Sequence, residues 1–132
     1  MQKSNFKFKN PKLTKLEFKV NQDYDNNSKS MLTLDIKDDI IVKRIDETSA
    51  SVILKLQIFR EEDFKDVPFI ISIEMQGDFS WSSDMDKEVV NALLKQNAPA
   101  VLLSYMRPYI TTVTTGSGYA PLILPFMNFV ES

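Results

Sequence analysis

The chain has 132 residues, enough for one domain with its own hydrophobic core. It contains no cysteine and no histidine, which excludes disulfides, thiol nucleophiles, histidine-based catalytic triads and zinc sites built from these residues. The net charge of −2 conceals a basic N-terminus, because residues 1–20 contain six lysines and a single acid, Glu17. Since the acidic remainder repels phosphates, we expect no nucleic-acid partner.

Targeting and membrane signals are absent from the pattern. Residues 1–10 lack the apolar core of a signal peptide, and no apolar run approaches the roughly 18 residues that span a bilayer. We therefore expect a cytoplasmic protein without membrane insertion. The expected organisation is a single domain over residues 1–132, in which residues 1–10 form a flexible basic N-terminus.

Apolar and polar residues alternate through the first two thirds of the chain, which is typical of strands with one buried face. A break in the alternation at Ile41 predicts a bulge near residues 38–39 or 43–44. Gly77, inside the last strand, indicates a bend or a close backbone approach. The pattern predicts an antiparallel sheet whose strands are residues 16–20, 32–42, 52–58 and 67–81.

The periodicity becomes helical after residue 84. Asp84 or Asp86 is expected to cap a short helix, and a second helix is expected to begin near Asn97 and to kink at Pro108. The buried stripe of this second helix is expected to consist of Leu102, Tyr105, Tyr109 and Val113. The fold class is therefore α+β, a four-stranded antiparallel sheet with helices packed on one face.

The last quarter of the chain is almost uncharged. Residues 97–132 contain only two charged side chains, Arg107 and Glu131, and about half of the residues are apolar or aromatic. One helix and an irregular tail cannot bury so many apolar side chains against one face of a small sheet. We therefore expect this segment to form a subunit interface or an apolar groove.

Three segments are similar to the SecB family of bacterial molecular chaperones. They are residues 97–107 (NAPAVLLSYMR), 118–129 (GYAPLILPFMNF) and 69–79 (FIISIEMQGDF). The resemblance implies a four-stranded antiparallel sheet with helices on one side and a homo-oligomer, a dimer or a tetramer. It further implies ATP-independent binding of unfolded or non-native polypeptides in apolar grooves, with no catalytic residue, metal or cofactor.

Seven residues are the candidates for a peptide-binding groove: Tyr24, Trp81, Leu122, Leu124, Phe126, Met127 and Phe129. Methionine and aromatic side chains adapt to many partners, which suits such a groove. The alternative for the five tail residues is packing in the core or in a subunit interface. The alternatives for Tyr24 and Trp81 are simple exposure and a half-buried core position, respectively.

The sequence departs from export-type SecB proteins in two respects. The chain ends at Ser132 without the further helix and acidic tail of those members. The positions matching their acidic SecA-binding residues are Lys15, Lys19 and Ser72, and these departures argue against hand-over to the SecA motor. A dedicated chaperone of a toxin–antitoxin pair is therefore an alternative to protein export.

Two further functions remain open at this point. A small-ligand carrier would use the space between helix and sheet as a closed pocket, and a structural oligomer would consume the apolar tail in self-assembly. Both differ from a chaperone in having no affinity for unfolded polypeptide.

Overall fold

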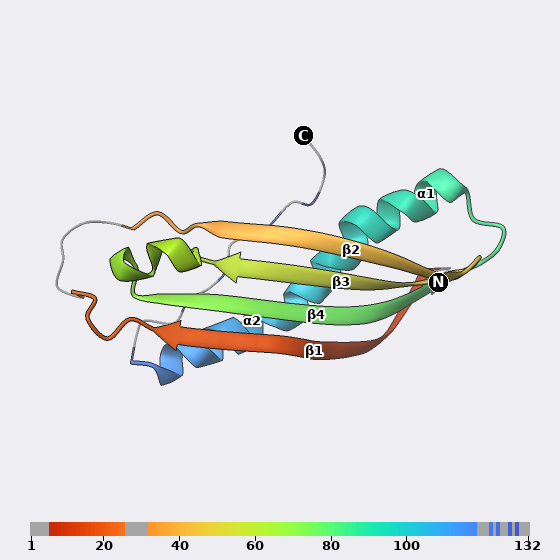
Figure 1. Ribbon diagram of the computed structural model, residues 1–132. Helices are drawn as coiled ribbons and strands as arrows, with labels where there is room; N and C mark the ends of the chain where they lie inside the picture. The colour runs from red at the N-terminus through yellow and green to blue at the C-terminus, as the bar shows by residue number, and fades with distance from the viewer. Residues whose placement is uncertain are drawn as a thin grey trace.

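A computed structural model describes residues 6–25 and 32–118, together with Leu122, Leu124, Met127 and Phe129 of the C-terminal segment. Its sheet has four antiparallel strands in the order β1-β4-β3-β2 (Figure 1). The strands are β1 (Phe6–Val20), β2 (Ile36–Asp46), β3 (Ser49–Ile58) and β4 (Phe69–Trp81). The α+β fold with a four-stranded antiparallel sheet is thus confirmed.

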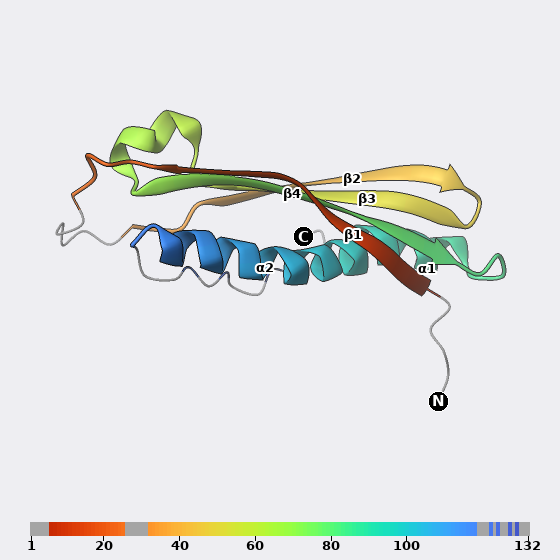
Figure 2. The ribbon, with the colours of Figure 1, turned by 90° about the horizontal axis from the view of Figure 1, so that it is seen from below.

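The helices form a second layer on one face of the sheet, as Figure 2 shows. A short helix α1 (Lys87–Ala92), a π-helical turn η2 (Leu93–Asn97) and a long helix α2 (Ala98–Gly116) follow one another without a break. The 3-10 helix η1 (Glu61–Asp66) lies at one end of the sheet on the side opposite α2. The expectation of helices packed on one face is confirmed, but the two expected helices form one continuous rod.

The core lies between α2 and the two central strands. Every second residue of β4 from Phe69 to Trp81 is buried, and so is the matching set on β3. On α2 the fully buried side chains include Leu102, Met106 and Ile110. Because side chains of a strand alternate between faces, the other face of the sheet carries the polar half of the pattern.

The buried stripe of α2 differs from the expected one. Leu102 is buried as expected, but Tyr105 and Tyr109 are 45% and 42% exposed. The stripe that faces the sheet passes through Met106 and Ile110 instead. The kink expected at Pro108, which lies inside α2, stays a prediction.

Residues 6–10 are not part of a flexible N-terminus. They begin strand β1, in which Phe6 pairs with Trp81 and Lys9 pairs with Asp78. Phe6 to Lys9 alternate between apolar and charged residues as a strand does, but the register of β1 slips between Lys9 and Lys12, at Asn10 with its positive φ of 58°, which separates this stretch from residues 16–20. The expectation of flexibility is therefore wrong from residue 6 onward.

Gly77 faces this irregular part of β1. A Cβ atom at Gly77 would lie 2.5 Å from Cε2 of Phe8 and 3.1 Å from Cδ2 of Leu102. The space that a Cβ would occupy is filled by side chains of β1 and α2, so the close approach at Gly77 is made by side chains and not, as the sequence had suggested, by the backbone. The expected irregularity in β2 is a register shift between Arg44 and Asp46, just beyond the second of the two expected positions.

Candidate functional site

The C-terminal segment is fastened to the last turns of α2 by two threonines. The Thr114 hydroxyl accepts a hydrogen bond from the Leu122 backbone N–H (2.8 Å), and the Thr111 hydroxyl donates to the Leu122 carbonyl (3.1 Å). Thr114 is fully buried, and its hydroxyl also donates to the Ile110 carbonyl at 2.9 Å. Both backbone groups of Leu122 are thereby paired, so the segment leaves the helix at a defined position.

Four of the five candidate tail residues can be placed. Leu124 is 3% exposed and belongs to the core, whereas Leu122, Met127 and Phe129 are half-buried and pack against it. For Leu124 the structure therefore favours core packing over a groove. Phe126 lies outside the described residues.

The outer face of α2 is uncharged and partly apolar. Besides Tyr105 and Tyr109, its exposed residues are Ala100, Ser104, Pro108, Thr112 and Thr115. The ring of Tyr105 packs against Phe8 of β1 at a centroid distance of 5.6 Å. A solvent-exposed helix normally carries charges on its outer face, so this surface is a candidate contact surface for another polypeptide.

Tyr24 lies at the end of the sheet where β1 ends and β4 begins. It is half-buried, and its N–H donates to the carbonyl of Asn21 at 3.2 Å. The side-chain amide of Asn21 is buried and donates to the carbonyls of Phe64, Lys65 and Val67 at 2.9, 3.3 and 3.1 Å. Asn21 thus joins β1 to η1 and to the segment leading into β4.

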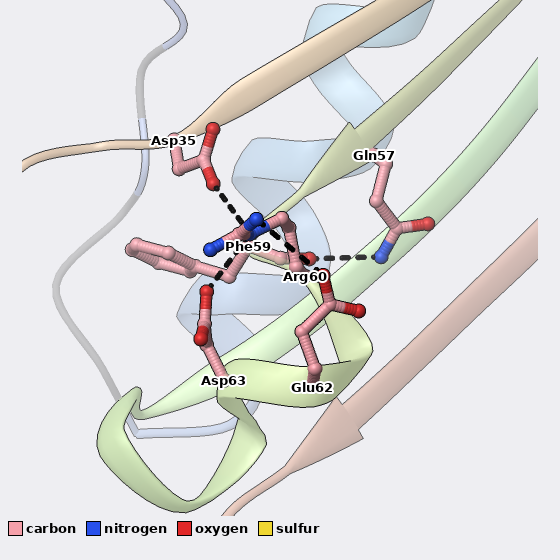
Figure 3. A network of polar contacts seen from close by, with 6 residues as sticks. All are labelled: Asp35, Gln57, Phe59, Arg60, Glu62 and Asp63. Atoms are coloured by element: carbon pink, nitrogen blue, oxygen red, sulfur yellow. Dashed lines mark hydrogen bonds and ion pairs between the residues drawn. The ribbon is translucent and has the colours of Figure 1, made fainter.

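The same end contains a network of ion pairs centred on Arg60 (Figure 3). Arg60 forms ion pairs with Asp35 (3.5 Å), Glu62 (3.4 Å) and Asp63 (3.0 Å). The hydrogen bond that Arg60 Nε donates to Asp63, followed by the negative charges of Asp63 and Glu62, raises the pKa of Arg60 above its usual value. The carboxylates compensate the positive charge of Arg60, so this network fixes the loop after β3 and leaves no positive charge for a ligand.

Trp81 lies at the opposite end of the sheet, beside the β2–β3 hairpin. It is 8% exposed, its ring stacks on Phe6 at 6.2 Å, and the guanidinium of Arg44 lies 5.2 Å from the ring centroid. Arg44 also donates from Nη2 to Oδ1 of Asn91 at 2.6 Å. A cavity of about 460 Å³ opens between these residues and α1.

Tyr24 and Trp81 lie at opposite ends of the sheet. Val20 pairs with Phe69 at one end of β4 and Phe6 pairs with Trp81 at the other. Twelve residues of strand separate these ends, about 40 Å at 3.4 Å per residue. Leu122 is hydrogen-bonded to Thr114 in the last turns of α2, and these turns lie at the end of the sheet that holds Tyr24 (Figure 2). Trp81 therefore lies apart from Tyr24 and Leu122 within one chain, and a role for it in peptide binding stays a prediction.

Neither a metal centre nor a membrane span is found in the described part of the chain. Residues 6–25 and 32–118 contain no cluster of three acidic side chains that would hold a metal ion. Over the same ranges no helix is both long and apolar enough to cross a bilayer. Asp86 caps α1 by accepting from the Glu88 N–H at 3.0 Å, so it is the capping residue of the two expected.

The face of the sheet opposite α2 is rich in lysine. On this face Lys15 pairs in register with Glu74 and forms an ion pair with it at 3.6 Å, and Lys55 reaches the same carboxylate at 3.5 Å. Ser72 is the next residue of β4 on this face. Lys19 pairs with Ile70 on the same face, and its ammonium lies 4.3 Å from the ring centroid of Phe64 in η1. The three positions compared above with SecA-binding residues therefore share the face of the sheet opposite α2.

Comparison with known proteins decides the family. The family described as preprotein translocase subunit SecB matches residues 8–131. The chain belongs to the SecB family. A SecB protein-export protein of Anaplasma phagocytophilum is 36% identical over 94 residues, covering 67% of this chain and 60% of that protein. An uncharacterized protein of Methanocaldococcus jannaschii is 28% identical over 123 residues, covering 92% of this chain and 78% of that relative.

Two of the relatives named as SecB protein-export proteins are longer than this chain. The chain spans 60% of the Anaplasma protein and 58% of the one from Rhodospirillum centenum. Among solved structures, the fold is similar to the SecB-like chaperone Rv1957 of Mycobacterium tuberculosis, solved with a ChAD peptide of the HigA1 antitoxin. The TM-score is 0.73 at 16% identity, over 93% of this chain and 91% of that one.

Sequence reasoning missed several residues of this SecB-family protein. Thr111 and Thr114 were not among the candidate residues, although a threonine hydroxyl near a helix end can bind a following segment. Arg44 and Asn91 are far apart in sequence, and only the sheet order brings them to Trp81. No local pattern contains that information.

Proposed function

We propose that this protein is an ATP-independent chaperone of the holdase type, which binds unfolded or non-native polypeptides in the cytoplasm. The observation that carries the proposal is the uncharged outer face of α2, where Tyr105 and Tyr109 are 45% and 42% exposed. A separate contribution comes from the C-terminal segment, whose half-buried Leu122 is held against α2 by Thr111 and Thr114. Membership of the SecB family and the fold shared with a SecB-like chaperone support a chaperone role.

Binding requires only burial of client side chains. Each large apolar side chain that leaves water contributes about 1.5–3 kcal/mol. Ordering an unfolded client offsets much of this gain, so single sites bind weakly. A homo-oligomer, a dimer or a tetramer, would present several such sites to one client and raise the overall affinity.

The test measures suppression of aggregation of a chemically denatured protein without nucleotide, together with the mass by light scattering. We expect the wild type to suppress aggregation near stoichiometric ratios. The double variant Tyr105→Asp/Tyr109→Asp should require about tenfold more protein for the same suppression, since a buried charge cancels the gain from burial.

Two control variants separate the interpretations. Tyr105→Phe/Tyr109→Phe keeps the rings and should suppress aggregation as the wild type does. Ile45→Asp adds a charge at another exposed apolar residue, 61% exposed and outside α2, and should also leave suppression unchanged. If Tyr105→Asp/Tyr109→Asp suppresses aggregation normally but forms a smaller assembly by light scattering, the tyrosines belong to a subunit interface. The proposal that the outer face of α2 binds clients is then wrong.

A second candidate is a dedicated chaperone of an antitoxin. It rests on the shared fold with Rv1957, whose structure contains an antitoxin peptide. If an antitoxin is encoded beside this gene, it should aggregate when produced alone and remain soluble with this protein. A general holdase would protect the denatured test protein equally well, whereas a dedicated chaperone would not.

A further inference from the structure

The cavity at the Trp81 end is separate from the surface proposed for client burial. It has a volume of about 460 Å³, within the range of small-ligand pockets. Its walls come from two parts of the chain that are distant in sequence: the β2–β3 hairpin, and the stretch from the end of β4 to α1. The tyrosines of α2 and the Leu122 attachment are not among its lining residues.

One wall of the cavity is apolar. Trp81, Met85 and Val90 supply it, and Val90 is anchored in the core at 2% exposure. The indole and the thioether are surfaces that accept bulky aliphatic or aromatic groups of varied shape. This wall therefore suits a large apolar side chain.

The rim of the cavity carries an excess of positive charge. Arg44 and Lys87 line it against one acid, Glu47. Within the described residues the Arg44 guanidinium contacts the indole of Trp81 and the neutral amide of Asn91, and neither group is a carboxylate. A guanidinium has five N–H donors, and stacking on a ring leaves the donors at its edge directed away from that ring.

We propose that this cavity is a binding subsite for a polypeptide segment in which a bulky apolar side chain lies next to an aspartate or glutamate. The apolar side chain would lie on Trp81 and Met85, and the neighbouring carboxylate would pair with the guanidinium of Arg44. The inference rests on the proposed chaperone function and deepens it. The cavity would add a preference for carboxylates to a protein whose α2 surface selects only apolar groups.

Trp81 makes the inference directly testable, because it is the only tryptophan of the chain. Its fluorescence can be titrated with two blocked peptides, Ac-Ala-Phe-Glu-Ala-NH₂ and the same peptide with Gln in place of Glu. We expect the Glu peptide to shift the emission and to bind about tenfold more tightly than the Gln peptide. Equal affinity of the two peptides, or no change in emission with either, would overturn the proposal.

Arg44→Gln should reduce the preference for the Glu peptide to about one. Arg44→Lys should keep part of it, because the charge remains but the paired donors do not. The matched control is Arg60→Gln at the far end of the sheet, which should keep the full preference. A preference that survives in Arg44→Gln, with an unchanged urea midpoint, contradicts the assignment to Arg44.

Two other occupants give distinct results. 3-Phenylpropionate offers the same chemistry without a peptide, and if it binds as tightly as the Glu peptide, the cavity is a small-molecule site. If the emission shifts on dilution of the protein alone and the peptides are inert, a second copy fills the cavity. Either result overturns the proposal. Suppression of aggregation, measured in parallel, tests the chaperone function separately, since it depends on the α2 tyrosines.

Discussion

The two ends of the sheet each hold an arginine, in opposite settings. Arg60, after β3, is surrounded by Asp35, Glu62 and Asp63 at 3.5, 3.4 and 3.0 Å. Arg44, near the end of β2, rests on an indole and a neutral amide beside a cavity. An arginine whose charge is neutralised by its own chain organises a loop, whereas one held by a ring and an amide keeps its charge for a ligand.

The comparison predicts that substitutions at the Arg60 end lower stability and that substitutions at the Arg44 end lower binding. The largest effect is expected for Asn21→Leu at the Arg60 end. It leaves the carbonyls of Phe64, Lys65 and Val67 without their side-chain donor, at a cost of about 2–3 kcal/mol. The urea midpoint should fall at constant m value. Gln22→Leu, at an exposed neighbour, should change stability by less than about 0.5 kcal/mol.

Thr114→Val should have the next largest effect. It removes the acceptor of the Leu122 N–H with little change in volume, which costs about 1–2 kcal/mol if the N–H stays buried. Hydrogen exchange at the Leu122 amide should accelerate. Thr115→Val removes a hydroxyl that donates only within the helix, at 2.7 Å to Thr111, and should leave that amide unchanged. Equal exchange in both variants would contradict the attachment of the tail through Thr114.

Arg60→Gln and Arg44→Gln compare the two arginines directly. Arg60→Gln should lower Tm slightly, and the difference should shrink in 1 M NaCl because exposed ion pairs are screened. Arg44→Gln should lose the hydrogen bond to Asn91 and a cation–π contact of about 0.5–1 kcal/mol, and it should abolish the preference for carboxylate peptides. If Arg60→Gln also abolishes the peptide preference, the contrast between the two ends fails.

The smallest effect is expected for Asp46→Asn in the hairpin beside the cavity. A hydrogen bond from the Thr48 backbone N–H is the main cause that lowers the pKa of Asp46 below its ordinary value of 3.8. Since the folded pKa is the lower one, this stabilisation is complete above the unfolded value and is lost as the pH falls through the folded value. The urea midpoint of Asp46→Asn should therefore fall less steeply than that of the wild type below pH 4. Parallel acid limbs for the two proteins would contradict this.

Patterns within a strand or helix predicted much of the fold. The alternation of side chains revealed β3 and β4, Asp86 was one of two expected caps of α1, and Gly77 marked a close approach. Residues 6–9 (FKFK) alternate as a strand does, but the register slip at Asn10 separates them from residues 16–20, and they were assigned to a flexible terminus. The slip depends on the neighbouring strand, so the sequence did not show that both stretches belong to one strand.

The candidate site was predicted less well, because it depends on contacts between distant segments. The apolar content of residues 97–132 indicated a contact surface, but it did not show that Leu124 is buried or that Tyr105 is exposed. Helical periodicity alone allowed two neighbouring stripes, and the sheet selected the one containing Met106. Trp81 was recognised as a candidate, whereas its partners Arg44 and Asn91 required the sheet order.

The π-helical turn η2 has a consequence for how α1 and α2 are oriented about their common axis. Val90, Leu94, Ala98 and Leu102 are buried at intervals of four residues, wider than the 3.6 residues of an α-helical turn. One widened turn over Leu93–Asn97 takes up part of the difference. Deleting Gln96 would therefore restore regular winding while rotating α1 by about 100° relative to α2. Asn91 would then turn away from Arg44. The one additional residue in η2 therefore sets which side of α1 faces the sheet when α2 is in place.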